Sequence, residues 1–146
     1  MRVRKSWCEK LEGAPPAKIV EIPPRMQKQW GRGLLLIPNP MDVDAAIRKI
    51  PRGKIMTLTE LREKLAREAG ANVTCPLCAG MFLRIAAEAA EEKRRAGKAR
   101  VTPYWRVVGQ GGRLLEKIPG GPQGQAEHLM AEGHKIDASG ALRLLA

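Results

Sequence analysis

Two closely spaced cysteines, Cys75 and Cys78, carry the most reactive side chains of this chain. Such a pair can exchange a disulfide or give two thiolate ligands to a metal, and His128 and His134 would complete four zinc donors. About fifty residues separate the two halves, however, whereas zinc fingers use compact spacing. The pair also lacks the strand-to-helix context of thioredoxins. We therefore expect a turn with two semi-buried thiols, and neither a metal nor another cofactor.

The charge of the chain indicates a polyanionic partner. Its 146 residues carry 26 Lys and Arg against 15 Asp and Glu, which gives a formal net charge of +11 and a pI of about 10.1. Such a surplus in one small domain is typical of nucleic-acid binding through phosphate contacts, the alternative being a generally basic proteome or solubility. Aromatic residues make up only 3% of the chain, so the core must be mainly aliphatic.

The elements that must position these residues fall into two parts. Residues 1–40 are basic and rich in proline, with short strands predicted at 18–22 and 34–37. We expect this part to be an extended arm that packs on the rest through its Trp and Leu residues, the alternative being a partly disordered basic tail. Residues 41–146 are predicted to form one domain.

The pattern of residues 41–146 is mainly helical. Helices are predicted at 41–50, from Thr57 or Thr59 to Gly70, at 81–96 and at 123–133, with a turn at 75–80. The charged run 91–95 is expected to be a solvated helix end. A strand is predicted at 100–108, a hairpin turn at 109–112 and a closing hairpin at 135–145. The expected fold class is mainly α with small β hairpins, in the outline of a winged helix-turn-helix domain with a basic N-terminal arm.

Four short motifs, in order, sharpen this outline. The first three begin at Ile50-Pro51, at Pro103-Tyr104 and at Gly120-Gly121, and the fourth runs from Leu129 to Glu132-Gly133-His134. In order and spacing they resemble the DNA-binding domain of the alkylguanine-DNA alkyltransferases, over roughly residues 41–136. That family has Ile-Pro-x-Gly-x-Val-x-Thr-Tyr, Pro-Cys-His-Arg-Val, Ser-Gly-Gly and Glu-Gly-His at these places. The resemblance implies a fold that enters the minor groove and turns a damaged guanine out of the stack.

The residues that carry the chemistry of that family are replaced here. The register of Arg106 and Val107 places Tyr104 where the family has its nucleophilic cysteine and Trp105 where it has its activating histidine. A phenol with a pKa near about 10 is a poor alkyl acceptor at neutral pH, and an indole cannot relay a proton. Leu58 stands in place of a tyrosine that helps to rotate the nucleotide. The chain therefore resembles the non-catalytic alkyltransferase-like proteins, unless Cys75 or Cys78 replaces the lost thiol.

The resemblance also predicts two sets of site residues. One set would contact DNA: Thr57, Gly80, Arg84 and Arg106. Arg84 would fill the gap left by a flipped base, or it would be a solvated arginine on the helix surface. The other set would surround the lesion pocket: Tyr104, Trp105, Val107, Gly120, Gly121 and Glu132. The two bulky rings could form the floor of an open pocket, or they could fill it.

We therefore expect a non-enzymatic protein that binds double-stranded DNA, recognises alkylated guanine or distorted duplex, and marks it for excision-repair proteins. The alternative is a regulator or architectural protein that kept the fold without lesion recognition. An odd number of cysteines and the lack of an apolar leader favour a cytoplasmic, nucleoid-associated protein, expected to be a monomer. The longest apolar stretch is too short for a membrane span.

Overall fold

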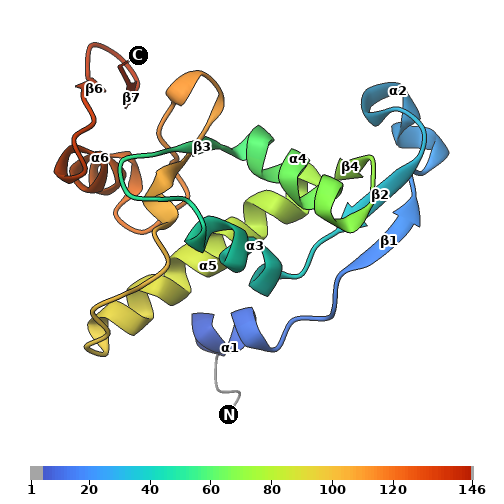
Figure 1. Cartoon of the computed structure of the whole chain (residues 1–146), viewed down its shortest axis with the longest axis horizontal. Helices are drawn as coiled ribbons and strands as arrows, with labels where there is room; N and C mark the ends of the chain where they lie inside the picture. The colour runs from blue at the N-terminus through green and yellow to red at the C-terminus, as the bar shows by residue number, and fades with distance from the viewer. Residues whose placement is uncertain (1–4, 146) are drawn as a thin grey trace.

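The computed structural model describes residues 5–145, and the helices within residues 40–95 lie in the middle of the molecule between two small β regions at opposite ends (Figure 1). The α-helices are α1 (Trp7–Glu12), α2 (Gln27–Trp30), α3 (Pro40–Arg48), α4 (Leu58–Ala69), α5 (Pro76–Arg95) and α6 (Gly121–Ala131). The 3-10 helices are η1 (Pro24–Met26), η2 (Tyr104–Arg106) and η3 (Gln110–Gly112). The strands are β1 (Lys18–Glu21), β2 (Leu34–Ile37), β3 (Met56–Thr57), β4 (Val73–Thr74), β5 (Val107–Val108), β6 (Ile136–Asp137) and β7 (Arg143–Leu144).

The N-terminal part forms ordered structure against the rest of the chain, and both strands predicted in it are present. β1 pairs antiparallel with β2, and β2 pairs in parallel with β4, with Leu35 opposite Val73 and Leu36 opposite Thr74. Leu36 is 4% exposed and belongs to the main core. These contacts join residues before position 40 to residues after it. The boundary predicted there therefore marks a change in sequence pattern and does not separate two independently packed parts.

Helix α1 docks on helix α5 through a carboxylate. Glu92 accepts hydrogen bonds from the backbone amides of Trp7 and Cys8, at 2.7 and 3.2 Å, so that it caps the N-terminus of α1 from another helix. The hydroxyl of Ser6 accepts from the Glu9 amide at 3.1 Å and caps the same helix locally. The charged run of α5 is therefore partly a docking surface, and the predicted solvated helix end was wrong for Glu92.

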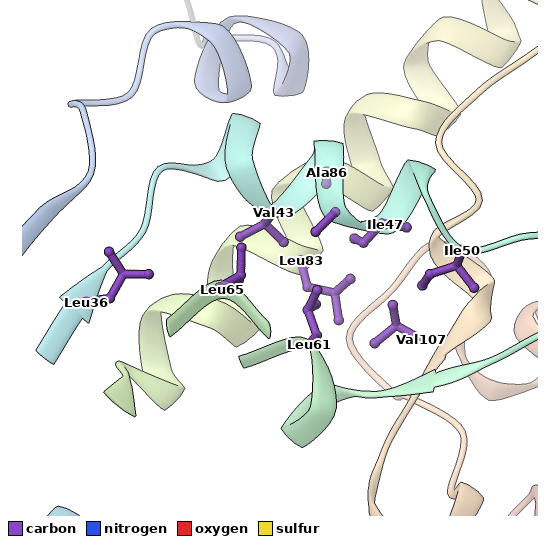
Figure 2. Packing of buried hydrophobic residues seen from close by; sticks show 10 residues of the cluster. Leu36, Val43, Ile47, Ile50, Leu61, Leu65, Leu83, Ala86 and Val107 are labelled. Carbon is purple, nitrogen blue, oxygen red and sulfur yellow. The ribbon is translucent and has the colours of Figure 1, made fainter. Parts of the chain in front are cut away.

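Helices α3 and α4 follow the predicted pattern because their signals are local. Asn39 caps α3 by accepting from the Met41 amide at 2.7 Å. Thr57 and Glu60 form a capping box at the start of α4, and Gly70 ends that helix with a left-handed φ of 74°. Their apolar faces meet α5 in an aliphatic core, which Figure 2 shows with Val43 and Ile47 of α3, Leu61 and Leu65 of α4, and Leu83 and Ala86 of α5.

Helix α5 begins earlier than predicted. It starts at Pro76, directly after β4, so that residues 76–80 are helical where a turn was expected. Proline at the first helical position loses no hydrogen bond, because the first four amides of a helix have no partner within it. Gly80 is tolerated inside the helix, and the Ala79 amide already donates to the Cys75 carbonyl at 3.0 Å.

The β structure beyond α5 differs in part from the prediction. The strand expected over residues 100–108 is reduced to β5, which pairs in parallel with β3, Met56 opposite Val107 and Thr57 opposite Val108. Residues 110–112 form the 3-10 helix η3 after Gly109, and this segment does not join two strands of one hairpin. The closing hairpin is present as β6 and β7. The predicted class, mainly α with small β elements, is confirmed, and no helix within residues 5–145 is long and apolar enough to cross a membrane.

Candidate nucleic-acid interface and the site around Glu132

Glu132 is the centre at which three of the four sequence motifs meet. Its carboxylate accepts from Trp105 Nε1 at 3.0 Å and from Arg106 Nε and Nη2 at 3.0 and 2.8 Å. Arg106 Nη1 also donates to the carbonyl of Ile50 at 2.7 Å. The first, second and fourth motifs therefore share one hydrogen-bonded cluster, and the third motif, Gly120-Gly121, starts the helix α6 that leads to Glu132.

The Arg106–Glu132 ion pair is well shielded from water. The two side chains are 13% and 7% exposed. Burial alone raises the pKa of the Glu132 carboxyl, but the hydrogen bonds from Arg106 and Trp105 outweigh that effect, and the pKa lies below its usual range. With Nε, Nη1 and Nη2 all engaged, the Arg106 guanidinium ties together the loop after α3 and the end of α6. The DNA contact predicted for Arg106 stays a prediction.

Tyr104 points into the protein and not toward a free surface. It is 1% exposed, and its hydroxyl donates to Glu91 Oε1 of α5 at 2.8 Å. Arg94 holds the other oxygen of the same carboxylate at 2.8 Å. Burial, followed by the neighbouring Glu91 charge, raises the pKa of the Tyr104 phenol. Tyr104 therefore stays protonated and has no nucleophilic character at neutral pH.

Trp105 is held in place by stacking on His128 and by its hydrogen bond to Glu132. Its ring lies parallel to the imidazole of His128 on α6, with ring centroids 4.1 Å apart and an interplanar angle of 10°. The Tyr104 ring meets Trp105 edge-on at 5.2 Å. Burial lowers the pKa of His128, which favours the neutral imidazole in this stack.

Gln125 ties the same site to the polypeptide backbone on three sides. It is 0% exposed, its Oε1 accepts from the Leu115 amide, and its Nε2 donates to the carbonyls of Trp105 and Val107. Gly120 precedes α6 with a left-handed φ of 77°, and a Cβ there would lie 3.2 Å from Gly124. Val107 is fully buried in the main core.

The residues predicted to surround a lesion pocket are thus brought together, but they pack against each other. Tyr104 and Val107 are buried, and Trp105 is covered by His128. A surface hollow of about 550 Å³ lies beside η3 and β7, and one of about 450 Å³ lies beside the start of α6; neither is lined by Tyr104 or Glu132. Of the two arrangements left open by the sequence, the geometry favours rings that fill the pocket.

The residues predicted to contact DNA lie in two places. Thr57 caps α4 next to β5, close to the site around Glu132. Gly80 and Arg84 lie on the N-terminal half of α5, and at 1.5 Å per residue Gly80 is roughly 16 Å along the helix from Glu91. The Arg84 guanidinium lies 5.5 Å from the Trp7 ring centroid, a cation–π contact that the sequence did not predict.

The N-terminal half of α5 also presents an apolar stripe to the outside. Leu77 and Met81 are 76% and 59% exposed, and open space surrounds the position of a Cβ on Gly80 between them. Side chains four residues apart lie on one face of a helix, so Leu77, Met81 and the neighbouring Gly80 and Arg84 form one surface, which we call the α5 stripe.

Cys75 and Cys78 lie at the N-terminal end of α5, far from Tyr104. Cys78 is roughly 20 Å along the helix from Glu91, the partner of Tyr104. Burial and the adjacent Cys75 thiol raise the pKa of Cys78 to about 11, so it is largely protonated at neutral pH. Both thiols are half-buried as predicted, but they sit at a strand-to-helix junction, the context that the sequence analysis judged to be missing. Within the described residues no group of three or more metal-binding side chains is assembled.

Comparison with known proteins gives one similar structure. No family model matches the sequence, and no curated protein matches it. The chain is similar to S. pombe Atl1, whose crystal structure is a complex with damaged DNA containing O6-carboxymethylguanine; the identity is 25%, the match covers 73% of this chain and 87% of that chain, and the TM-score is 0.48.

Sequence reasoning missed three residues of the site: Glu91, Gln125 and His128. Glu91 was assigned to a solvated run but is 5% exposed. Gln125 and His128 lie in a helix with little amphipathic pattern, so no periodicity marks their buried sides. A signal was available for His128 only, because helical spacing places it on the same side of α6 as Glu132, four residues later.

Proposed function

We propose that this protein is a non-enzymatic DNA-binding protein that recognises alkylated guanine or distorted duplex through the minor groove and marks it for excision-repair proteins. The observation that carries this proposal is the meeting of the motif residues Ile50, Trp105, Arg106 and Glu132 in one buried cluster. Residues from motifs that are far apart in the sequence thus contact one another in the fold. The net charge of +11 supports a duplex as the partner. We propose a cytoplasmic, nucleoid-associated monomer of winged helix-turn-helix type.

The chemistry of the site supports the proposed absence of catalysis. Tyr104 is a protonated phenol bound to Glu91, and Trp105 donates its only N–H to Glu132. Incubation with duplex containing O6-methylguanine should leave the mass of the protein unchanged. A mass increase of one methyl group would overturn this part of the proposal, and peptide mapping would show whether Cys75 or Cys78 carries it.

The α5 stripe is the surface that we assign to the groove. Apolar side chains such as Leu and Met are the wedges that minor-groove proteins insert between base steps. Replacing Met81 by alanine should therefore weaken duplex binding on the order of tenfold, equal to about 1.4 kcal/mol. Met130→Ala is the matched control, because Met130 is 50% exposed on α6 and outside the stripe. Equal effects of the two variants would remove α5 from the interface.

A second candidate is a DNA-binding regulator or architectural protein without lesion recognition. The burial of Tyr104 and the stacking of Trp105 on His128 favour it, because a flipped base would have to displace both aromatic rings. Fluorescence anisotropy with three labelled duplexes separates the candidates: one intact, one with a single O6-alkylguanine and one with a mismatch. Equal affinity for all three would leave only the second candidate, whereas no binding to any of them would reject both.

A further inference from the structure

Two arginines face each other beside the closing hairpin. Arg113, after the turn η3, forms an isolated antiparallel bridge with Arg143 of β7. Both side chains line the hollow of about 550 Å³, together with Gln110, Gly111 and Ala141. Arg143 is 60% exposed at its side chain, so the hollow is open to solvent.

The backbone holds this pair in place. The Leu114 amide donates to the Leu142 carbonyl at 3.0 Å, which fixes the segment after η3 against the hairpin. Gly112 has a φ of 80°, and a Cβ there would lie 3.3 Å from the Cβ of Leu144. A residue other than glycine would be strained in this conformation and would press on β7. The approach of Arg113 to Arg143 is therefore built into the turn.

Arg113, Arg143 and Asp137 form one row across the hairpin, and its charges do not balance. Side chains directly opposite each other in an antiparallel pair project on the same face, with Cβ atoms about 5 Å apart, where like charges destabilise the pairing. Asp137 lies opposite Arg143 on its other side, but their ion pair is long, at 3.7 Å, and Asp137 Oδ1 also accepts from Ser139. Arg113 makes no ion pair with any of residues 5–145. This row thus holds one carboxylate for two arginines, and the carboxylate pairs with Arg143.

We propose that Arg113 and Arg143 together bind one backbone phosphate of duplex DNA in this hollow. A phosphate would neutralise the excess positive charge, and two planar guanidinium groups fit its oxygens in the bidentate manner that arginine favours. Gln110 adds an amide donor at the rim. This inference rests on the proposed function, and it adds a second contact on the closing hairpin, away from the α5 stripe.

The test is the salt dependence of binding to an undamaged duplex. Each phosphate contact that is lost lowers the steepness of log K against log salt by about 0.9. The double variant Arg113→Gln/Arg143→Gln should therefore bind more weakly and show a slope that is shallower by about 1. The matched control is Arg25→Gln/Arg32→Gln, which removes the same charge from exposed positions on either side of α2, at the opposite end of the molecule (Figure 1). The control should keep the wild-type slope.

A gain-of-binding variant makes the test independent of damage to the fold. Asp137→Asn removes the competing carboxylate but keeps the Oδ1 acceptor for Ser139, so duplex binding should become tighter. The inference would be overturned if both double variants kept the wild-type affinity and slope, or if the slope changed equally in both. Either result would leave the proposed function intact. Loss of inorganic phosphate binding in the Arg113/Arg143 variant with an unchanged duplex slope would assign the site to free phosphate. Absence of duplex binding by the wild type would reject the proposed function itself.

Discussion

Replacing Tyr104 by alanine should remove a large part of the stability of the protein. Its ring packs with Ala87, Ala90 and Ile118, and truncating a buried aromatic side chain to alanine costs about 3–5 kcal/mol. The hydroxyl also donates to the charged Glu91, and such a bond contributes about 1.5–3 kcal/mol. The free energy of unfolding of a small domain is about 5–15 kcal/mol in total. A loss of about 5 kcal/mol would therefore leave the alanine variant close to unfolding.

Tyr104→Phe isolates the hydroxyl from the ring. We expect it to lose about 1.5 kcal/mol, at the lower end of the range, because Glu91 keeps its two hydrogen bonds from Arg94. Urea denaturation followed by tryptophan fluorescence is a suitable assay, because the Trp105 ring centroid lies 5.2 Å from that of Tyr104. Leu145→Ala is the control, at 52% exposure and an expected loss within about 0.5 kcal/mol. A phenylalanine variant as stable as the wild type, or an alanine variant that loses under about 1 kcal/mol, would refute the reasoning.

Three further predictions concern the groups around this site. Glu132→Ala leaves the Arg106 guanidinium, 13% exposed, without its carboxylate, and should cost about 3–5 kcal/mol in urea denaturation; a loss under about 1 kcal/mol would mean that the pair is solvated. Because burial lowers the pKa of His128, its neutral form stabilises the protein above the unfolded-state pKa of about 6.5, and this contribution is lost as the pH falls through the folded-state value. His128→Gln should therefore make stability less dependent on pH between 7 and 5, roughly the range over which histidine titrates, and an unchanged profile would contradict this. Glu92→Gln should loosen α1 and increase amide exchange and proteolysis within it, whereas Glu88→Gln, one turn earlier, should not; equal protection in both variants would show that the Glu92 cap is dispensable.

The parts of the fold that the sequence predicts well are those with local signals. α4 was predicted correctly because the Thr57–Glu60 capping box and Gly70 mark its two ends within the helix itself. The start of α5 was missed because Pro76 and Gly80 are typical of turns as well as of first helical turns, and only the packing of Ala79 and Leu83 in the core decides between them. β5 lies within the strand predicted over residues 100–108, but its shortness and its pairing with β3 could not be predicted, because β3 lies about fifty residues earlier and pairs through two residues only.

The site, too, was predictable only in part. The motifs predicted which residues would gather, and Trp105, Arg106 and Glu132 do share one cluster. The sequence could not predict the direction of the Tyr104 side chain, because it depends on Glu91, a residue whose charged neighbours suggest a solvated surface. A buried carboxylate among charges is revealed only by its partners in space.

The two adjacent glutamates of α5 have a consequence for the order of folding. Glu92 holds the amides of Trp7 and Cys8, which lie 85 and 84 residues earlier, while Glu91 holds Tyr104, 13 residues later. Contacts between distant residues form late, since closing a long loop costs chain entropy before any contact repays it. During synthesis the docking of α1 must therefore wait until residue 92 has emerged, and it follows the assembly of the central helices. Helix α1, made before α5, is among the last elements to reach its place.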